Sequence, residues 1–243
     1  MARINLTAVD VTFRIFDAGQ RSFTRHLLPG TRAEKGLEIA ALSAITLVLE
    51  PGSRIALLGP NSSGKTTMLR VMAGLVPPLR GTASIHGRPG AVFSIGFGAL
   101  PEASLADLAY AQGLLMGVPP ALARAKVDEI LDFAEIRSQA KCPAHVAPPG
   151  VLSRLGTAAA LCLNADILLF DEVLDNMDPH FHGKLETAIA ERIDSGAILV
   201  MAERSRGLLS RFCSEALLLC DGQLSARGPL DAILRDGGAS LTF

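Results

Sequence analysis

The sequence predicts an α/β protein with a mainly parallel sheet and flanking helices. Short apolar, strand-like segments alternate with helical segments near both ends of the chain, which is typical of a parallel sheet buried between helical layers. One of these strands runs directly into a glycine-rich turn and then into a helix. A helix-rich stretch over about residues 97–155 interrupts the alternation, which indicates one domain with an inserted lobe or two small domains.

The first part of the chain contains strands and one strand–loop–helix unit. Residues 3–16 and 39–50 alternate in the manner of strands, and a polar, basic, turn-rich segment separates them. The apolar strand RIALLG leads into the helical segment KTTMLRVMAGL. Turn glycines then bound the short strands of GTASIHGRPGAVFSI.

The second part begins with helices and returns to the alternating pattern. Helices are predicted over 104–117 and 119–136, and the second opens at two prolines that suit a helix start. The alternation resumes with a helix from about 151, the strand DILLF, a helix over 180–194, the strand AILVMA, a short helix, the strand EALLLCDG and a last helix GPLDAILRD.

Composition excludes several classes of protein. The chain of 243 residues carries 23 basic and 24 acidic side chains, so its net charge provides no field that would recruit nucleic acid. The N-terminus lacks the apolar segment of a secretory signal. No run of 18 apolar residues is present, so we expect a protein that does not itself span a membrane.

The residues that most often bind zinc show no metal-site spacing. Four cysteines are scattered without a C-x-x-C pair, and three lie in apolar runs, which favours reduced core thiols over a metal site or disulfides. His180 and His182 form an H-x-H pair that we interpret as a surface pair rather than a zinc site. The cysteines are Cys142, Cys162, Cys213 and Cys220.

The segment GPNSSGKTT fits the phosphate-loop pattern G-x-x-x-x-G-K-[ST] and lies between a strand and a helix, where such a loop must lie. Its backbone N–H groups are expected to surround the β-phosphate, Lys65 to neutralise β/γ oxygens, and the Thr66 hydroxyl to coordinate Mg²⁺. The alternative is a glycine turn that only caps a helix. The predicted nucleotide-binding residues of this loop are Gly59, Pro60, Asn61, Ser62, Ser63, Gly64, Lys65, Thr66 and Thr67.

A second acidic motif complements the loop. The apolar strand of DILLFDE ends in Asp171 and Glu172, about a hundred residues after the loop. Asp171 is expected to hold Mg²⁺, and Glu172 to polarise the attacking water as a general base. A strand that ends in two acids is commonly only solvent-facing, but together with the phosphate loop it predicts an ATPase site.

The motifs GPNSSGKTT and ILLFDEVLDNMDPHF, with a helical insert between them, resemble the nucleotide-binding subunit of ABC transporters. More narrowly, GFGALPEASLADLAYAQGLLMG, SRLG and ILVMAERSRGLLSRFCSEALLLCDGQLSARGP resemble ATPases that export capsular polysaccharide, O-antigen and teichoic acid. The resemblance implies a single nucleotide-binding domain over residues 1–243 that binds ATP and Mg²⁺. It implies a RecA-like core over about 1–96 and 156–243, a helical subdomain over about 97–155, and an N-terminal antiparallel β-subdomain.

The residues before SRLG depart from the family pattern. In the family this signature loop contacts the γ-phosphate of ATP bound to the facing subunit through a serine hydroxyl and glycine amides. Pro148 stands at the serine position and is followed by Pro149, and neither can donate a hydrogen bond. Gly150 remains and is predicted to contact ATP, so we expect a weakened contact across the dimer.

Other family positions also differ. The switch histidine after the strand AILVMA corresponds best to Arg204, with Glu203 as the alternative, and an arginine could stabilise γ-phosphate charge instead. The segment FSIGFGALPEASL lacks the glutamine that senses Mg²⁺ and water, and Gln112 is too far along. Phe13 is the candidate for stacking on adenine. Asp178 matches an acid at the dimer seam, or only a helix N-cap.

The resemblance also implies partners and a location. Two copies, or this chain and a second ATPase subunit, would drive an integral membrane permease subunit from the cytoplasmic face of the inner membrane, where the chain is peripheral. The alternative is a catalytically weak regulatory subunit or heterodimer partner. A basic cluster is interpreted as a solvated loop or as a contact for phospholipid headgroups or a pyrophosphoryl-lipid substrate; it comprises Arg14, Arg21, Arg25, His26, Arg32 and Lys35.

Overall fold

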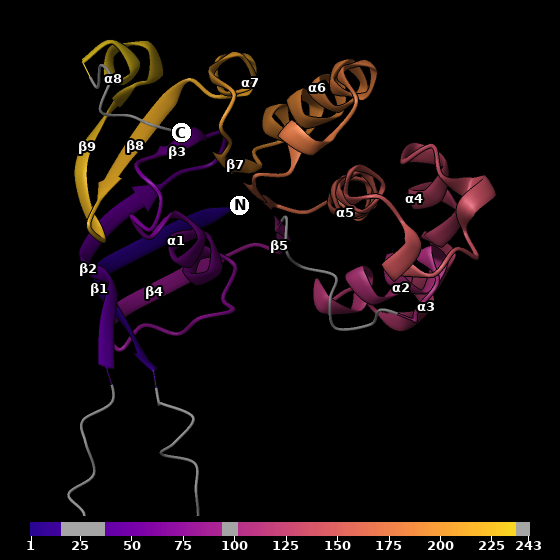
Figure 1. The fold of residues 1–243 in the computed structure, drawn as a ribbon, viewed down its shortest axis with the longest axis horizontal. Coiled ribbons are helices and arrows are strands. Elements are labelled where there is room, and N and C mark those ends of the chain that lie inside the picture. The colour runs from indigo at the N-terminus through magenta and orange to yellow at the C-terminus, as the bar shows by residue number, and fades with distance from the viewer. Residues whose placement is uncertain (16–36, 94–101, 237–243) are drawn as a thin grey trace, which may run out of the picture.

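The structure is a computed structural model that describes residues 1–15, 37–93 and 102–236 (Figure 1). Its smaller sheet is antiparallel, with the strand order β2–β1–β4. Burial alternates along β1: Ile4 and Leu6 are completely buried, whereas Arg3 and Asn5 are not. The strands are β1 (Arg3–Ile15), β2 (Leu37–Leu49) and β4 (Arg80–His86).

The larger sheet has six strands in the order β5–β6–β7–β3–β8–β9. All neighbouring strands are parallel except β8 and β9, which pair antiparallel at one edge. The mainly parallel sheet and the N-terminal antiparallel sheet confirm the predicted fold class. The strands are β3 (Arg54–Leu58), β5 (Pro89–Phe93), β6 (Ile167–Asp171), β7 (Ile198–Ala202), β8 (Glu215–Cys220) and β9 (Gln223–Pro229).

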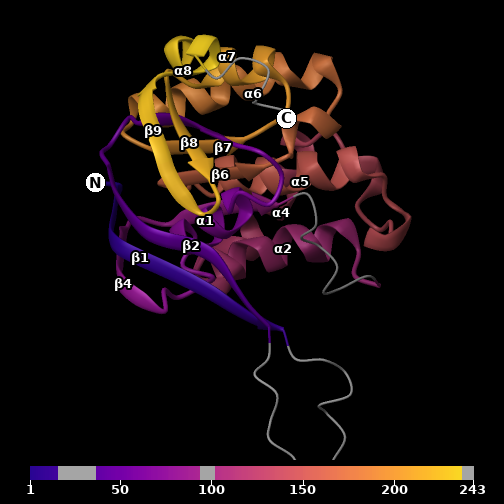
Figure 2. The ribbon, with the colours of Figure 1, turned by 60° about the vertical axis from the view of Figure 1, so that its left-hand side comes forward.

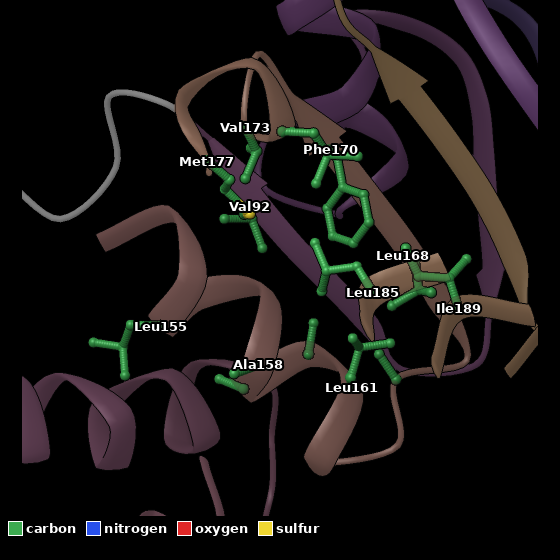
Figure 3. Close-up of a cluster of buried hydrophobic side chains, with 14 of the residues drawn as sticks. Val92, Leu155, Ala158, Leu161, Leu168, Phe170, Val173, Met177, Leu185 and Ile189 are labelled. Atoms are coloured by element: carbon green, nitrogen blue, oxygen red, sulfur yellow. The ribbon is translucent and has the colours of Figure 1, made fainter. Parts of the chain in front are cut away.

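Apolar residues cover both faces of the larger sheet. In β6, Ile167 and Leu169 belong to one buried cluster, whereas Leu168 and Phe170 belong to the other. Successive side chains of a strand point to opposite faces, so a central strand buried on both faces reads as an unbroken apolar run. Figure 3 shows Leu168 and Phe170 among apolar side chains that include Leu185.

Helix α1 (Lys65–Met72) lies between the two sheets (Figure 1, Figure 2). Its buried residues Met68, Leu69 and Met72 share a cluster with Ile4 of the antiparallel sheet and with strands of the larger one. This packing fixes the direction of the helix, and therefore fixes where its N-terminus points.

The other face of the larger sheet is covered by α5 and α6, and α2, α3 and α4 gather beside α5 on the side away from the antiparallel sheet (Figure 1). Helix α5 runs across residues 155 and 156, so the predicted boundary between helical subdomain and core falls within one helix, and the division stays a prediction. The helices are α2 (Leu105–Leu115), α3 (Pro120–Ala125), α4 (Val127–Phe133), α5 (Pro149–Cys162), α6 (Pro179–Asp194), α7 (Arg206–Phe212) and α8 (Leu230–Asp236).

Three local predictions were wrong or incomplete. The single helix expected over 119–136 is two helices, α3 and α4, which meet at Lys126. Strand β9 was not predicted, because its half-polar sequence pairs only at the sheet edge beside β8. Of the four cysteines only Cys213 is fully buried, and that burial raises its pKa to about 12.

Within the described ranges, no helix is both long enough and apolar enough to cross a membrane.

Candidate nucleotide site

The loop between β3 and α1 is shaped by two glycines that approach other backbone closely. Gly59 has φ of +143°, and a Cβ there would lie 2.2 Å from the carbonyl oxygen of Leu219. Gly64 has φ of +103°, and a Cβ there would lie 2.6 Å from the carbonyl oxygen of Ala41. Only glycine tolerates these positions, so the loop is fixed between β8 and β2.

The N-terminus of α1 has the properties of an anion site. The first N–H groups of a helix have no partner inside the helix, and its dipole favours negative charge there. No side chain caps α1 at Gly64, and its first turn contains no acid. The buried Oγ of Ser63 has no hydrogen-bond partner among the described residues. Phosphate oxygens of a nucleotide would therefore fit this end of the helix.

Lys65 lies with its ammonium group over the same loop. Its Nζ donates hydrogen bonds to the carbonyl oxygens of Gly59 at 2.6 Å and Pro60 at 2.9 Å. Burial lowers the pKa of Lys65, whereas the nearby charges of Glu172 and Asp171 act to raise it. The cation thus lies close to two carboxylates and next to the helix N-terminus.

Thr66 and Asp171 meet across the site, as expected for residues that share a metal ion. The Thr66 Oγ1 donates a hydrogen bond of 2.8 Å to Asp171 Oδ2, although the two residues are 105 positions apart. Asp171 is the buried last residue of β6, and burial raises its pKa, against the hydrogen bond from Thr66, which lowers it. A hydroxyl and a carboxylate are oxygen ligands that suit Mg²⁺, so the pair fits the predicted ion.

Glu172 pairs with Arg204 through both carboxylate oxygens. Arg204 Nε donates to Oε1 at 3.0 Å and Nη2 donates to Oε2 at 2.9 Å. The backbone of Glu172 has a positive φ of 53°, and its N–H donates to the carbonyl oxygen of Ala202 at 2.7 Å. The sequence predicted both residues for the site but did not predict that they bind each other.

The loops that carry this ion pair are joined by two further carboxylates. The buried Glu203 accepts hydrogen bonds from the backbone N–H groups of Val173 and Leu174 at 2.9 Å and of Asp175 at 3.3 Å. In return, Asp175 Oδ2 accepts from the backbone N–H of Arg204 at 2.8 Å and from that of Ser205 at 3.3 Å. Each loop therefore binds the backbone of the other.

Glu203 should make the stability of the fold depend on pH. Burial raises the pKa of Glu203 to about 7 from an ordinary value of 4.5, against the backbone hydrogen bonds, which lower it. Between these two pH values the folded protein keeps a proton that the unfolded chain releases. This contribution to stability is therefore complete below pH 4.5 and decreases as the pH rises to about 7, by on the order of 1 kcal/mol for each pH unit.

We expect Glu203→Gln to remove this contribution. Urea unfolding at pH 5 and pH 8 should show a smaller loss of stability with rising pH in the variant than in the parent chain. Glu191→Gln, at an exposed position of α6, is the control and should keep the parent's slope. Equal slopes for Glu203→Gln and the parent chain would contradict the assignment.

The signature-loop residues lie at the start of α5. Pro148 is the N-cap residue and Pro149 is the first residue of the helix, a position where proline is well tolerated. A Cβ at Gly150 would lie 2.5 Å from the carbonyl oxygen of Asn176, so this glycine also has a packing role inside the chain. Its contact with ATP of a facing subunit stays a prediction.

Phe13 lies on β1 opposite Ile39 of β2, and the residue is 40% exposed. Two residues further along β2 is Ala41, whose carbonyl oxygen lies at Gly64 of the phosphate loop. The strand pair therefore brings Phe13 to the side of the loop, which is compatible with the predicted adenine contact.

Some predicted surface residues have other roles. His182 is buried rather than exposed, and its Nε2 lies 3.1 Å from the carbonyl oxygen of Leu174, so the expected surface pair with His180 is wrong. Asp178 is the N-cap residue of α6, without a side-chain capping bond. Arg14 pairs with Glu38 at 2.9 Å. The rest of the predicted basic cluster lies outside the described residues, as does most of the segment FSIGFGALPEASL.

Sequence reasoning did not find Asp175, and considered Glu203 only as an alternative for the switch position. A signal for Glu203 was present, because it directly follows an apolar strand, as Asp171 ends one. The neighbouring parallel strands β6 and β7 end at the same edge of the sheet, so acids after both strands must lie near each other.

A glycine-shaped loop at a helix N-terminus, a lysine over it, and a threonine bound to a strand-end aspartate define a phosphate-loop nucleotide-binding protein. Residues 42–175 match the family model described as ABC transporter. The chain belongs to this family, as its motifs indicated, and membership implies ATP hydrolysis.

Curated relatives agree with this assignment. The chain is 31% identical over 222 residues to the O-antigen export system ATP-binding protein of Yersinia enterocolitica, covering 88% of this chain and 92% of that protein. It is 30% identical to an O-antigen export system ATP-binding protein of Myxococcus xanthus, covering 78% of this chain but 44% of that protein. It is also 30% identical to a teichoic acids export ATP-binding protein of Bacillus anthracis, covering 84% and 37% of the two chains.

Solved structures show the same fold. A dimeric ATP-binding cassette in a post-hydrolysis state, bound to ADP and phosphate, matches with a TM-score of 0.73 at 19% identity over 93% of this chain and 98% of that one. The ATP-binding subunit of an ABC transporter matches with a TM-score of 0.71 at 20% identity, over 97% and 93% of the two chains.

Proposed function

We propose that this chain is the ATP-hydrolysing subunit of an exporter that moves a polysaccharide or a lipid-linked glycan through a separate integral membrane permease subunit. The observation that carries the proposal is the contact between Thr66 and Asp171 beside Lys65 and Glu172. The glycan class is supported by the relatives, which are named for export of O-antigen and teichoic acids.

The chemistry assigned to the residues follows from their positions. The loop from Gly59 to Thr67 binds the phosphates of the substrate ATP, and Lys65 neutralises β/γ oxygens. Thr66 and Asp171 would hold Mg²⁺, which would supply positive charge next to the transferred phosphate. Glu172 accepts a proton from water as the water oxygen bonds to the γ-phosphorus and the bond to the β-phosphate oxygen breaks, which leaves ADP and phosphate.

We further propose that the chain works as one half of a dimer at the cytoplasmic face of the inner membrane, where it is peripheral to the permease. The second subunit is another copy or a different ATPase, and Gly150 of one subunit contacts ATP on the other. Because Pro148 and Pro149 donate no hydrogen bonds at this contact, hydrolysis by the chain alone should be slow.

A second candidate is a regulatory or heterodimer-partner subunit that binds ATP without turning it over. The observation that favours it is the ion pair in which Arg204 occupies both oxygens of Glu172. The prolines at the start of α5 support it too.

Complementation in the source cell distinguishes the two candidates. After deletion of the gene, we expect surface glycan to be lost and lipid-linked glycan to accumulate inside the cell. The parent gene should restore export, whereas a gene carrying Glu172→Gln should not. Restoration by Glu172→Gln would favour the regulatory role, and unchanged surface glycan after deletion would contradict the proposed cargo.

A further inference from the structure

The pairing of Glu172 with Arg204 sets a condition on catalysis. Both oxygens of the carboxylate accept hydrogen bonds from the guanidinium, in the two-bond geometry that is the strong form of this pair. A carboxylate held this way is poorly placed to take a proton from water. We therefore expect Arg204 to leave Glu172 before Glu172 acts as a general base.

We propose that Arg204 is a nucleotide-dependent gate on Glu172. The guanidinium binds the Glu172 carboxylate until ATP is bound. The terminal phosphate of ATP then binds the guanidinium in place of the carboxylate, which leaves Glu172 free to accept a proton from water. ADP lacks this phosphate and leaves the pair intact. The inference rests on the proposed ATPase function, and adds to it a mechanism by which the substrate releases the base.

The anchoring of the two loops leaves the side chain of Arg204 as the part that moves. The Arg204 backbone N–H is bound by Asp175, and Glu203 binds the loop that begins after Glu172. By contrast, the Arg204 side chain is 59% exposed, and that of Glu172 is 34% exposed. A guanidinium on a fixed backbone can exchange one partner for another by rotation of its side chain alone.

The competing partner would bind next to the pair. One small cavity is lined by Gly59, Asn61 and Lys65 of the phosphate loop together with Glu172 and Arg204. Both Glu172 and Arg204 act electrostatically on Lys65, which places all three charges within range of each other. A phosphate group offers a guanidinium the same two-bond geometry as a carboxylate and carries more negative charge.

The ion-pair exchange predicts a coupling that nucleotide binding can measure. With Mg²⁺ present, dissociation constants would be measured for ADP and for the non-hydrolysable analogue AMP-PNP. The proteins are the parent chain, Glu172→Gln, Arg204→Gln and the double variant. Because Glu172→Gln releases the guanidinium, it should lower the dissociation constant for AMP-PNP by roughly three- to tenfold. The dissociation constant for ADP should change by less than about twofold.

Arg204→Gln should weaken the binding of AMP-PNP but not that of ADP. In the double variant, Glu172→Gln should have no further effect on the affinity for AMP-PNP. Glu172→Gln could instead tighten the binding of AMP-PNP equally with and without Arg204. The cause would then be only the loss of a negative charge, and the gate would be overturned. Equal tightening of ADP overturns it too. The exposed pair Arg211 and Glu186 supplies a matched control cycle, in which nucleotide affinity should not change.

The same measurements separate this inference from the proposed function. Intact ATP hydrolysis by the parent chain with no coupling between Glu172 and Arg204 overturns the gate alone. Failure of the parent chain to bind either nucleotide overturns both the gate and the ATPase function.

Discussion

Glu172→Gln should lower kcat for ATP hydrolysis by roughly 10²- to 10⁴-fold, the range contributed by a positioned general base. Glutamine keeps the shape of the side chain but cannot accept the proton of the attacking water. Glu172→Gln leaves Lys65 and the N-terminus of α1 in place, so binding of ATP should persist. The measurement is steady-state hydrolysis of Mg·ATP, with nucleotide binding determined in the same preparations.

Glu191→Gln on the exposed face of α6 controls for the loss of a carboxylate elsewhere, and its kcat should equal that of the parent chain. If Glu172→Gln hydrolysed ATP at the parent rate, another group would be the base. If the parent chain bound ATP tightly but neither it nor the variant hydrolysed it, even with the permease present, the regulatory role would be favoured.

Asp171→Asn should lower kcat/KM for Mg·ATP by about 10²-fold or more, because charge stabilisation by a bound metal ion is worth several kcal/mol. Asparagine can still accept the hydrogen bond from Thr66, so the fold around β6 should survive. The variant lacks the negative charge proposed to hold Mg²⁺. Its nucleotide affinity should therefore respond little to removal of Mg²⁺ by EDTA, whereas the affinity of the parent chain should fall.

Thr66 offers a matched pair of variants for the same ion. Thr66→Ser keeps the hydroxyl and should keep the response to Mg²⁺, whereas Thr66→Val keeps the shape, removes the oxygen and should behave like Asp171→Asn. A parent-like response to EDTA in both Asp171→Asn and Thr66→Val would place the ion elsewhere.

The parts of the site that sequence could predict are local or obey strand periodicity. The phosphate loop is continuous in sequence, so one motif predicts the positions of its glycines, Lys65 and Thr66. Asp171 could be predicted because parallel strands end at a common edge, and an apolar strand that ends in an acid is easily recognised. The large sheet was predictable for a similar reason, since strands buried on both faces are apolar at every position.

What sequence could not predict depends on side-chain direction. Glu203 and Arg204 are adjacent, yet one is buried under the loop after β6 and the other is exposed against Glu172. An offset of one residue exchanges these roles, and no local pattern settles it. The buried position of His182 is equally non-local, because it depends on the carbonyl of Leu174 in a turn eight residues earlier.

The tight contact at Gly150 gives α5 a mechanical property. The helix has 14 residues and so extends about 21 Å, and its first turn touches the carbonyl of Asn176 without space for a methyl group. The side chain of Asn176 donates to the carbonyl oxygen of Glu172 at 2.8 Å. Because this end of α5 has no free space against Asn176, a displacement of α5 should shift Asn176 and, through its hydrogen bond, the backbone of Glu172, the proposed general base.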